Sequence, residues 1–228
     1  MTPRPPLVSE ALFVPVTPCR IADTRKGGGF MANNASRAFY VTGTTGFAPQ
    51  GGKSGGCRIP TGATGVTANV TAAGTVSDGY LTGYPTGSIA PITNFITTHR
   101  NFNLTANPTF ALAAGNARPL TIANHGGNTH VVVDVTGYYI PQLEGLVNIA
   151  GATYAGTSRM LGATQLGTGS YRVQWDTDVA NCAPMVTVYG GLPGYATSQN
   201  LNTVYTIIRT YSPAGTPTDF ATQVSVSC

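Results

Sequence analysis

Charged residues are scarce in this chain. Only 9% of its 228 residues are Asp, Glu, Lys or Arg, against roughly 25% in an average globular protein. The arginines are scattered, and Lys26 and Lys53 are the only lysines, so no basic run is available to follow a nucleic-acid backbone. We therefore expect no nucleic-acid partner. A neutral polar surface suits packing against other subunits or binding to sugars.

Long apolar runs are also missing, and none approaches the roughly 20 residues of a membrane span. We therefore expect no membrane partner. The opening segment MTPRPPLVSE, residues 1–10, has no apolar core of the kind found in secretory signal peptides. We interpret this segment as an extended arm because its three prolines disfavour a helix. We therefore expect either release by a route other than Sec secretion or a sequence that has been trimmed from a longer one.

No Cys-x-x-Cys motif is present, which excludes a zinc ribbon or a thioredoxin-type redox site. The four cysteines fall two early and two late, at Cys19, Cys57, Cys182 and Cys228. This distribution favours one disulfide in each half, Cys19–Cys57 and Cys182–Cys228. Four buried free thiols are the alternative, and four cysteines allow three connectivities.

No convincing helix of three turns is found, whereas strand patterns recur about every 8–12 residues, a spacing typical of a β-sandwich or a barrel. In TGVTANVTA, Val66, Ala68 and Val70 share one face. Val131, Val133 and Val135 do so in THVVVDVTGYYI, as do Tyr171, Val173 and Trp175 in GSYRVQWDTD. The Asp78-Gly79 pair is a common hairpin signal. The predicted fold class is all-β, with two tandem β-sandwich, jelly-roll-like domains.

The predicted organisation is an N-terminal arm over residues 1–10, a first domain over 11–142 and a second domain over 146–228. The segment PQLEG, residues 141–145, contains Pro, a charge and Gly after a long apolar strand. It is therefore interpreted as a linker.

The densest charge in the chain lies in TPCRIADTRKGGG, residues 17–29, which holds Arg20, Asp23, Arg25 and Lys26. A phosphate-binding loop needs its glycines before the lysine and a helix after it, and here the order is reversed. We expect a structural ion pair of Asp23 with Arg25. Asp134 lies in an apolar strand and needs a partner if buried, so Arg25 or Arg20 is expected to pair with it. An exposed charged loop is the alternative.

No catalytic group or metal site stands out. His130 and Asp134 are four residues apart on a strand, roughly 13 Å, which is too far for a catalytic pair. His125 and His130 flank a turn, and Asp176 and Asp178 share a strand face, but neither pair completes a metal-binding pattern. We expect no enzymatic activity, no metal and no cofactor.

Ordered motifs in the first half resemble a β domain repeated in bacterial, especially actinobacterial, surface and secreted proteins. They are PCRIADTR (residues 18–25), NVTA (69–72), GYLTGYP (79–85) and VVVDVTGYY (131–139), and the match spans about residues 12–141. The second half, through GSYRVQWDTDVANC (169–182) and the final Cys228, resembles a small β domain at the ends of bacterial surface and bacteriophage appendage proteins. These resemblances imply an all-β, non-enzymatic surface module.

The expected function is a structural protein on a bacteriophage virion surface, as a capsid decoration, collar or fibre component. We expect it to self-associate, as a homotrimer, and to contact other virion or surface proteins. Lysis would then expose the cysteines to oxidising conditions. The alternative is a secreted bacterial adhesion or carbohydrate-binding module, or a filament subunit, with host glycans as ligands. A glycan-cleaving enzyme is a third class.

Overall fold

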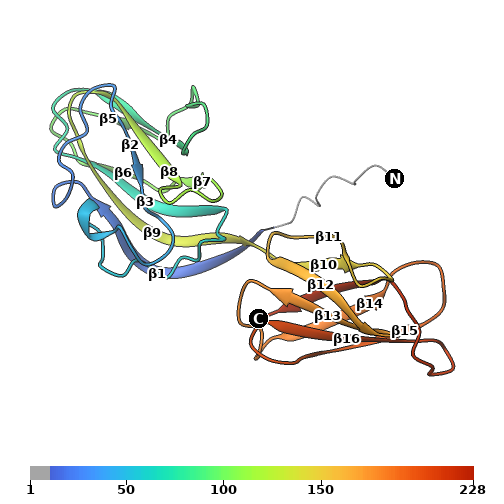
Figure 1. Cartoon of the computed structure of the whole chain (residues 1–228). Helices are drawn as coiled ribbons and strands as arrows, with labels where there is room; N and C mark the ends of the chain where they lie inside the picture. The colour runs from blue at the N-terminus through green and yellow to red at the C-terminus, as the bar shows by residue number, and fades with distance from the viewer. Residues whose placement is uncertain (1–10) are drawn as a thin grey trace. The chain divides into compact units, whose positions relative to one another are not determined.

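The computed structural model describes residues 11–228, which form two compact units, Leu12–Ile140 and Pro141–Cys228 (Figure 1). The arm expected over residues 1–10 lies outside the described residues. The fold is all-β, as predicted, with several antiparallel sheets and no α-helix among residues 11–228. Within these residues, no helix is long and apolar enough to cross a membrane.

Two sheets make up the first unit, and one short 3-10 helix, η1 (Ala48–Gln50), lies between β2 and β3. The first sheet has the order β1-β9-β3-β6 with β7 also on β3, and the second has the order β2-β8-β4-β5. The strands are β1 (Ala11–Asp23), β2 (Ser36–Phe39), β3 (Gly65–Ala73), β4 (Gly79–Pro85), β5 (Ile96–Thr98), β6 (Leu104–Ala106), β7 (Thr109–Ala111), β8 (Leu120–Gly126) and β9 (His130–Pro141).

One hydrophobic core draws on both sheets of the first unit. The valines predicted to share faces, at positions 66, 70, 131, 133 and 135, are completely buried. They meet Phe39, Leu81 and Ile122 from β2, β4 and β8. A strand whose alternate residues are apolar must bury that face, and here each sheet covers the other.

The second unit also has two four-stranded sheets, with the orders β11-β10-β17-β14 and β12-β13-β16-β15. Its core is built around Tyr171, Val173 and Trp175, whose predicted inward face is confirmed by their burial. The strands are β10 (Leu143–Val147), β11 (Thr153–Gly156), β12 (Met160–Gly167), β13 (Ser170–Trp175), β14 (Ala183–Val188), β15 (Tyr195–Asn200), β16 (Tyr205–Tyr211) and β17 (Thr222–Ser227).

Two local expectations are wrong. The segment interpreted as a linker, residues 141–145, contains the start of strand β10, because Leu143 and Val147 alternate into the core of the second unit. The Asp78-Gly79 pair does not close a hairpin, because β3 and β4 lie in different sheets. The chain crosses from one sheet to the other at this point.

Candidate functional site

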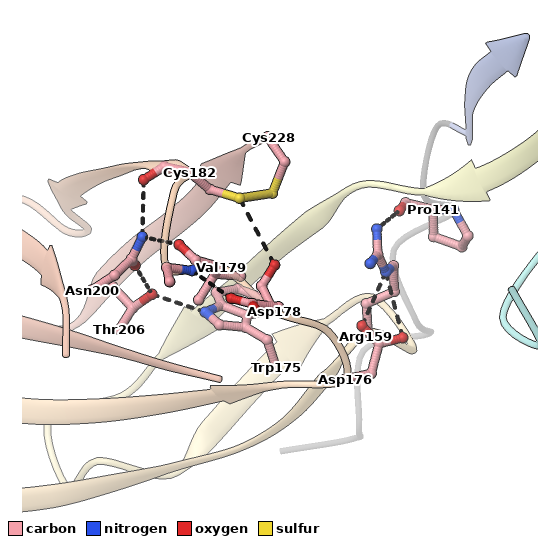
Figure 2. Close-up of a disulfide and its surroundings, with 11 residues drawn as sticks. Pro141, Arg159, Trp175, Asp176, Asp178, Val179, Cys182, Asn200, Thr206 and Cys228 are labelled. Atoms are coloured by element: carbon pink, nitrogen blue, oxygen red, sulfur yellow. Dashed lines mark hydrogen bonds and ion pairs between the residues drawn. A yellow bond between two sulfur atoms is a disulfide. The ribbon is translucent and has the colours of Figure 1, made fainter. Parts of the chain in front are cut away.

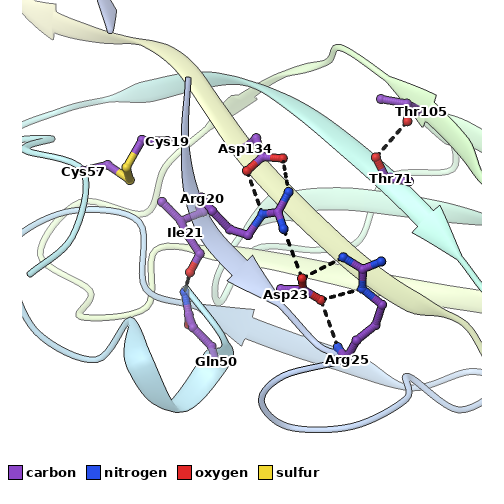
Figure 3. Close-up of polar contacts among 10 residues, drawn as sticks. All are labelled: Cys19, Arg20, Ile21, Asp23, Arg25, Gln50, Cys57, Thr71, Thr105 and Asp134. Atoms are coloured by element: carbon purple, nitrogen blue, oxygen red, sulfur yellow. Dashed lines mark hydrogen bonds and ion pairs between the residues drawn. A yellow bond between two sulfur atoms is a disulfide. The ribbon is translucent and has the colours of Figure 1, made fainter. Parts of the chain in front are cut away.

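Four charged residues form one cluster where the end of β1 lies beside β9, and we call Arg20, Asp23, Arg25 and Asp134 the arginine clamp (Figure 3). Arg20 donates from Nε to Asp134 Oδ1 and from Nη2 to Asp134 Oδ2, both at 2.9 Å. This two-point arrangement fits the planar fork of a guanidinium to a carboxylate. The pair joins two strands that are 114 residues apart in sequence.

Asp23 is the buried member of the clamp, with none of its surface exposed. Arg25 donates to it from Nε and Nη2, both at 2.8 Å, and from its backbone N–H at 3.1 Å. Arg20 adds a bond from Nη1 to Asp23 Oδ2 at 3.2 Å. Hydrogen bonds from Arg25, opposed by burial, lower the pKa of Asp23 to about 2. Because Arg20 also holds Asp134, it bridges the carboxylates of Asp23 and Asp134.

The expected ion pair of Asp23 with Arg25 is present, and of the two arginines expected for Asp134 it is Arg20 that pairs with it. The clamp differs from the expectation in which acid is buried. The fully buried acid is Asp23, whereas the Asp134 side chain keeps 28% of its surface exposed. Asp134 alternates with the inward valines of β9 and therefore points away from the core.

The turn after β1 is fixed to β9 by backbone bonds. Thr24 donates its N–H to Val131 O at 3.0 Å and accepts the Val131 N–H on Oγ1 at 2.9 Å. Gly51 has a φ of +79°, and a Cβ there would lie 2.1 Å from Asp23 O. Glycine is therefore required where the η1 segment approaches the clamp.

A disulfide between Cys19 and Cys57 connects β1 to the segment that follows η1. Gln50 reinforces this connection, because its Nε2 donates to Ile21 O at 2.7 Å and its Oε1 accepts the Tyr40 N–H at 2.9 Å. The charged stretch of residues 17–29 is thus tied to its surroundings by a covalent bond, ion pairs and backbone bonds. This arrangement can hold a strand in place.

The second unit has its own disulfide, Cys182–Cys228, next to a buried polar relay (Figure 2). Trp175 Nε1 donates to Thr206 Oγ1 at 2.9 Å, and Thr206 donates to Asn200 Oδ1 at 2.8 Å. Asn200 Nδ2 donates to the carbonyls of Val179 and Cys182. The relay satisfies the indole N–H inside the core and fixes the segment that carries Cys182.

The residues considered for metal binding are engaged elsewhere. His125 stacks on Tyr80 with ring centroids 4.6 Å apart, and His130 Nδ1 lies 3.1 Å from Thr24 Oγ1. Asp176 pairs with Arg159 at 3.1 Å, and Asp178 accepts the N–H of Ala180. Among residues 11–228, no three His, Cys, Asp or Glu side chains are grouped as a metal would require.

Comparison with known proteins found little. No protein-family model and no curated protein matched the chain. A solved structure titled Red Clover Necrotic Mosaic Virus is 13% identical, with 95% of this chain and 96% of that chain covered and a TM-score of 0.24. A likeness at this level carries no argument about fold or function.

Sequence reasoning missed the most exposed large apolar side chains within residues 11–228. Ile89 and Ile92 lie in the loop between β4 and β5 and expose 95% and 104% of their reference areas. Other large apolar side chains are exposed on both units, among them Phe30, Phe102, Leu161, Leu166 and Leu192. The stretch SIAPI, residues 88–92, could have indicated this, because its proline lies between two isoleucines in a segment with no strand alternation.

Proposed function

We propose that this protein is a non-enzymatic structural protein that assembles on the surface of a bacteriophage virion, as a capsid decoration, collar or fibre component. The observation that carries the proposal is the pair Ile89 and Ile92, held fully exposed in the loop between β4 and β5. Burying one such side chain contributes about 1.5–3 kcal/mol. Ile89 and Ile92 would therefore stabilise an interface once a partner covers them.

The internal bracing supports the same role. Each unit carries one disulfide, and the first is further tied by the arginine clamp. Disulfides are typical of proteins that mature in an oxidising environment. A subunit on the outside of a particle meets that environment once the host cell lyses.

We also propose, following the motif resemblance, that the two units are tandem β-sandwiches of a bacterial and phage surface-domain family and that the assembly is a homotrimer. In each unit, one core receives side chains from both sheets, which supports a sandwich. Low surface charge supports close packing of copies, because few charges must be desolvated at their interface.

The location of the protein in a producing culture tests whether it is part of a virion. Antibody raised against the purified chain should label particles released from the producing culture, as seen by immunogold electron microscopy. Particle proteins separated by density gradient should contain the chain at a fixed ratio to the major capsid protein. Label confined to the envelope of intact cells would contradict the virion role and support the surface-adhesion alternative.

Carbohydrate binding is the second candidate, favoured by the sheet β12-β13-β16-β15. Tyr195 and Tyr211 are register partners on β15 and β16, and their rings stack at 5.1 Å. On the same sheet, Arg172 lies 4.9 Å over the ring of Tyr205. Aromatic faces next to polar side chains can stack on sugar rings. Glycan-array binding that is lost in Tyr195→Ala would support this candidate.

A further inference from the structure

A small pocket in the first unit lies between the turn after β1, strand β2 and the η1 segment. Its volume is about 160 Å³. Two arginines, a tyrosine and the backbone of several glycines line it. The lining residues that matter here are Gly27, Gly28, Arg37, Tyr40, Gln50 and Arg118.

Arg37 brings a positive charge to this pocket. It donates from Nη1 to Gly29 O at 3.2 Å and from Nη2 to Phe30 O at 3.1 Å. These neutral carbonyls fix the guanidinium but do not neutralise it. Burial lowers the pKa of Arg37, because a partly desolvated cation is disfavoured. None of the ion pairs formed within residues 11–228 includes Arg37.

Arg118 supplies a second guanidinium from just before β8. Its Cζ lies 4.9 Å from the centre of the Tyr40 ring, so the cation is held over the aromatic face. Gly46 packs against the same ring, where an added Cβ would lie 2.5 Å from ring carbon. Arg118, like Arg37, takes part in none of the ion pairs of the described residues.

Formal charge is distributed unevenly between the two units, and the pocket lies in the positive one. Residues 12–140 hold eight Lys or Arg and three Asp, a formal charge of +5, whereas residues 141–228 hold three Arg and four acids, a formal charge of −1. Two of the three aspartates in the first unit are taken up by the clamp. The remaining positive charge therefore favours an anionic ligand on the first unit.

The size of the pocket restricts that ligand. A volume of about 160 Å³ is below the roughly 300 Å³ or more of a site for a drug-sized ligand. The pocket itself holds one anionic group with a few attached atoms, and any larger ligand extends out of it into solvent. Arg37 already donates from Nη1 and Nη2 to two backbone carbonyls, so a carboxylate would accept from its remaining N–H groups and from the guanidinium of Arg118.

We propose that this pocket binds the carboxylate of an acidic saccharide, of the hexuronic acid type, between Arg37 and Arg118. The ring hydroxyls of a hexuronate lie close to its carboxylate. They can therefore reach the phenol of Tyr40 and the backbone of Gly28 while the carboxylate occupies the pocket. The proposal is independent of assembly, because the pocket lies within one unit.

An NMR titration of the isotope-labelled full chain tests this proposal, with sodium glucuronate, acetate and glucose as separate probes at constant ionic strength. Glucuronate should give saturable shifts at the amides of Gly27, Gly28 and Tyr40, with an affinity at least tenfold above that of acetate. Glucose should give none. Equal binding of acetate and glucuronate, or binding of glucose, would overturn the saccharide acid as ligand, and no saturable shift would overturn the site.

Arginine variants distinguish binding in the pocket from nonspecific attraction to the positive charge of the unit. Arg118→Gln removes an exposed side chain and should weaken glucuronate binding at least tenfold while the spectrum stays folded. Arg37→Gln should do the same, although it also loses the bonds to Gly29 and Phe30. Arg100→Gln is the matched control, since it removes one charge from the same unit outside the pocket and should bind as the parent does. Equal weakening in Arg100→Gln and Arg118→Gln would show nonspecific attraction and overturn the proposal.

Discussion

Asp23 combines complete burial with a charge, so its ionisation is coupled to the stability of the first unit. Its pKa in the folded chain is about 2, below the ordinary value of about 3.9 for an unfolded chain. The unfolded state therefore binds a proton first as the pH falls. The clamp contribution is fully present above about pH 4 and is lost as the pH falls towards 2.

Asp23→Asn should destabilise the first unit by about 2 kcal/mol at pH 7, because two partly exposed arginines lose their shared carboxylate. It should also flatten the fall in stability between about pH 4 and pH 2. Hydrogen-exchange mass spectrometry of β9 peptides measures this unit alone. Asp176→Asn, in the other unit, is the matched control. Parent-like exchange at pH 7 in Asp23→Asn would show that the clamp does not stabilise the strand pair.

Thr206 is the central link of the buried relay in the second unit. Thr206→Val leaves the indole N–H of Trp175 and the amide oxygen of Asn200 without this partner. We expect a loss of about 1–3 kcal/mol for such buried unsatisfied groups. Trp175 is the only tryptophan, so denaturant titration followed by its fluorescence reports this unit. Thr164→Val, at an exposed strand position, should change stability little, and similar losses in both variants would argue against the relay.

Strands as elements could be predicted, but their partners could not. Alternation of period two identified the buried faces around Val66, Val131 and Tyr171 because each sheet buries only one side. Whether consecutive strands pair or cross between sheets depends on contacts far apart in sequence. The Asp78-Gly79 turn therefore has the same local chemistry in a hairpin and in a crossover.

The candidate site was predictable to a similar extent. Asp23 and Asp134 could be singled out because acids within apolar strands need partners. Choosing between Arg20 and Arg25 required the side-by-side placement of β1 and β9, which no local pattern specifies. The pocket of Arg37 and Arg118 joins residues 81 positions apart in the sequence and left no motif.

The Cys182–Cys228 disulfide should act on the second unit alone. Its cysteines are 46 residues apart. Removing a cross-link that closes a loop of this length lowers the free energy of unfolding by about 3–4 kcal/mol on the chain-entropy model. Replacing both cysteines with serine should lower the stability reported by Trp175 fluorescence by this amount. Exchange in β9 of the first unit should remain at the parent rate. A matching loss in both units would show that they unfold as one body.

At the scale of the whole molecule, we expect copies of the protein to assemble through exposed apolar side chains. The paired variant Ile89→Ser with Ile92→Ser removes the most exposed of these, and Val76→Ser is a matched control because it changes an exposed apolar residue of the same unit.

Sedimentation velocity over a range of protein concentrations measures assembly directly. The parent chain and Val76→Ser should form a discrete, concentration-dependent oligomer, and the paired isoleucine variant should shift towards monomer while its β9 exchange is unchanged. A parent chain that sediments as a monomer at every concentration reached would contradict the account.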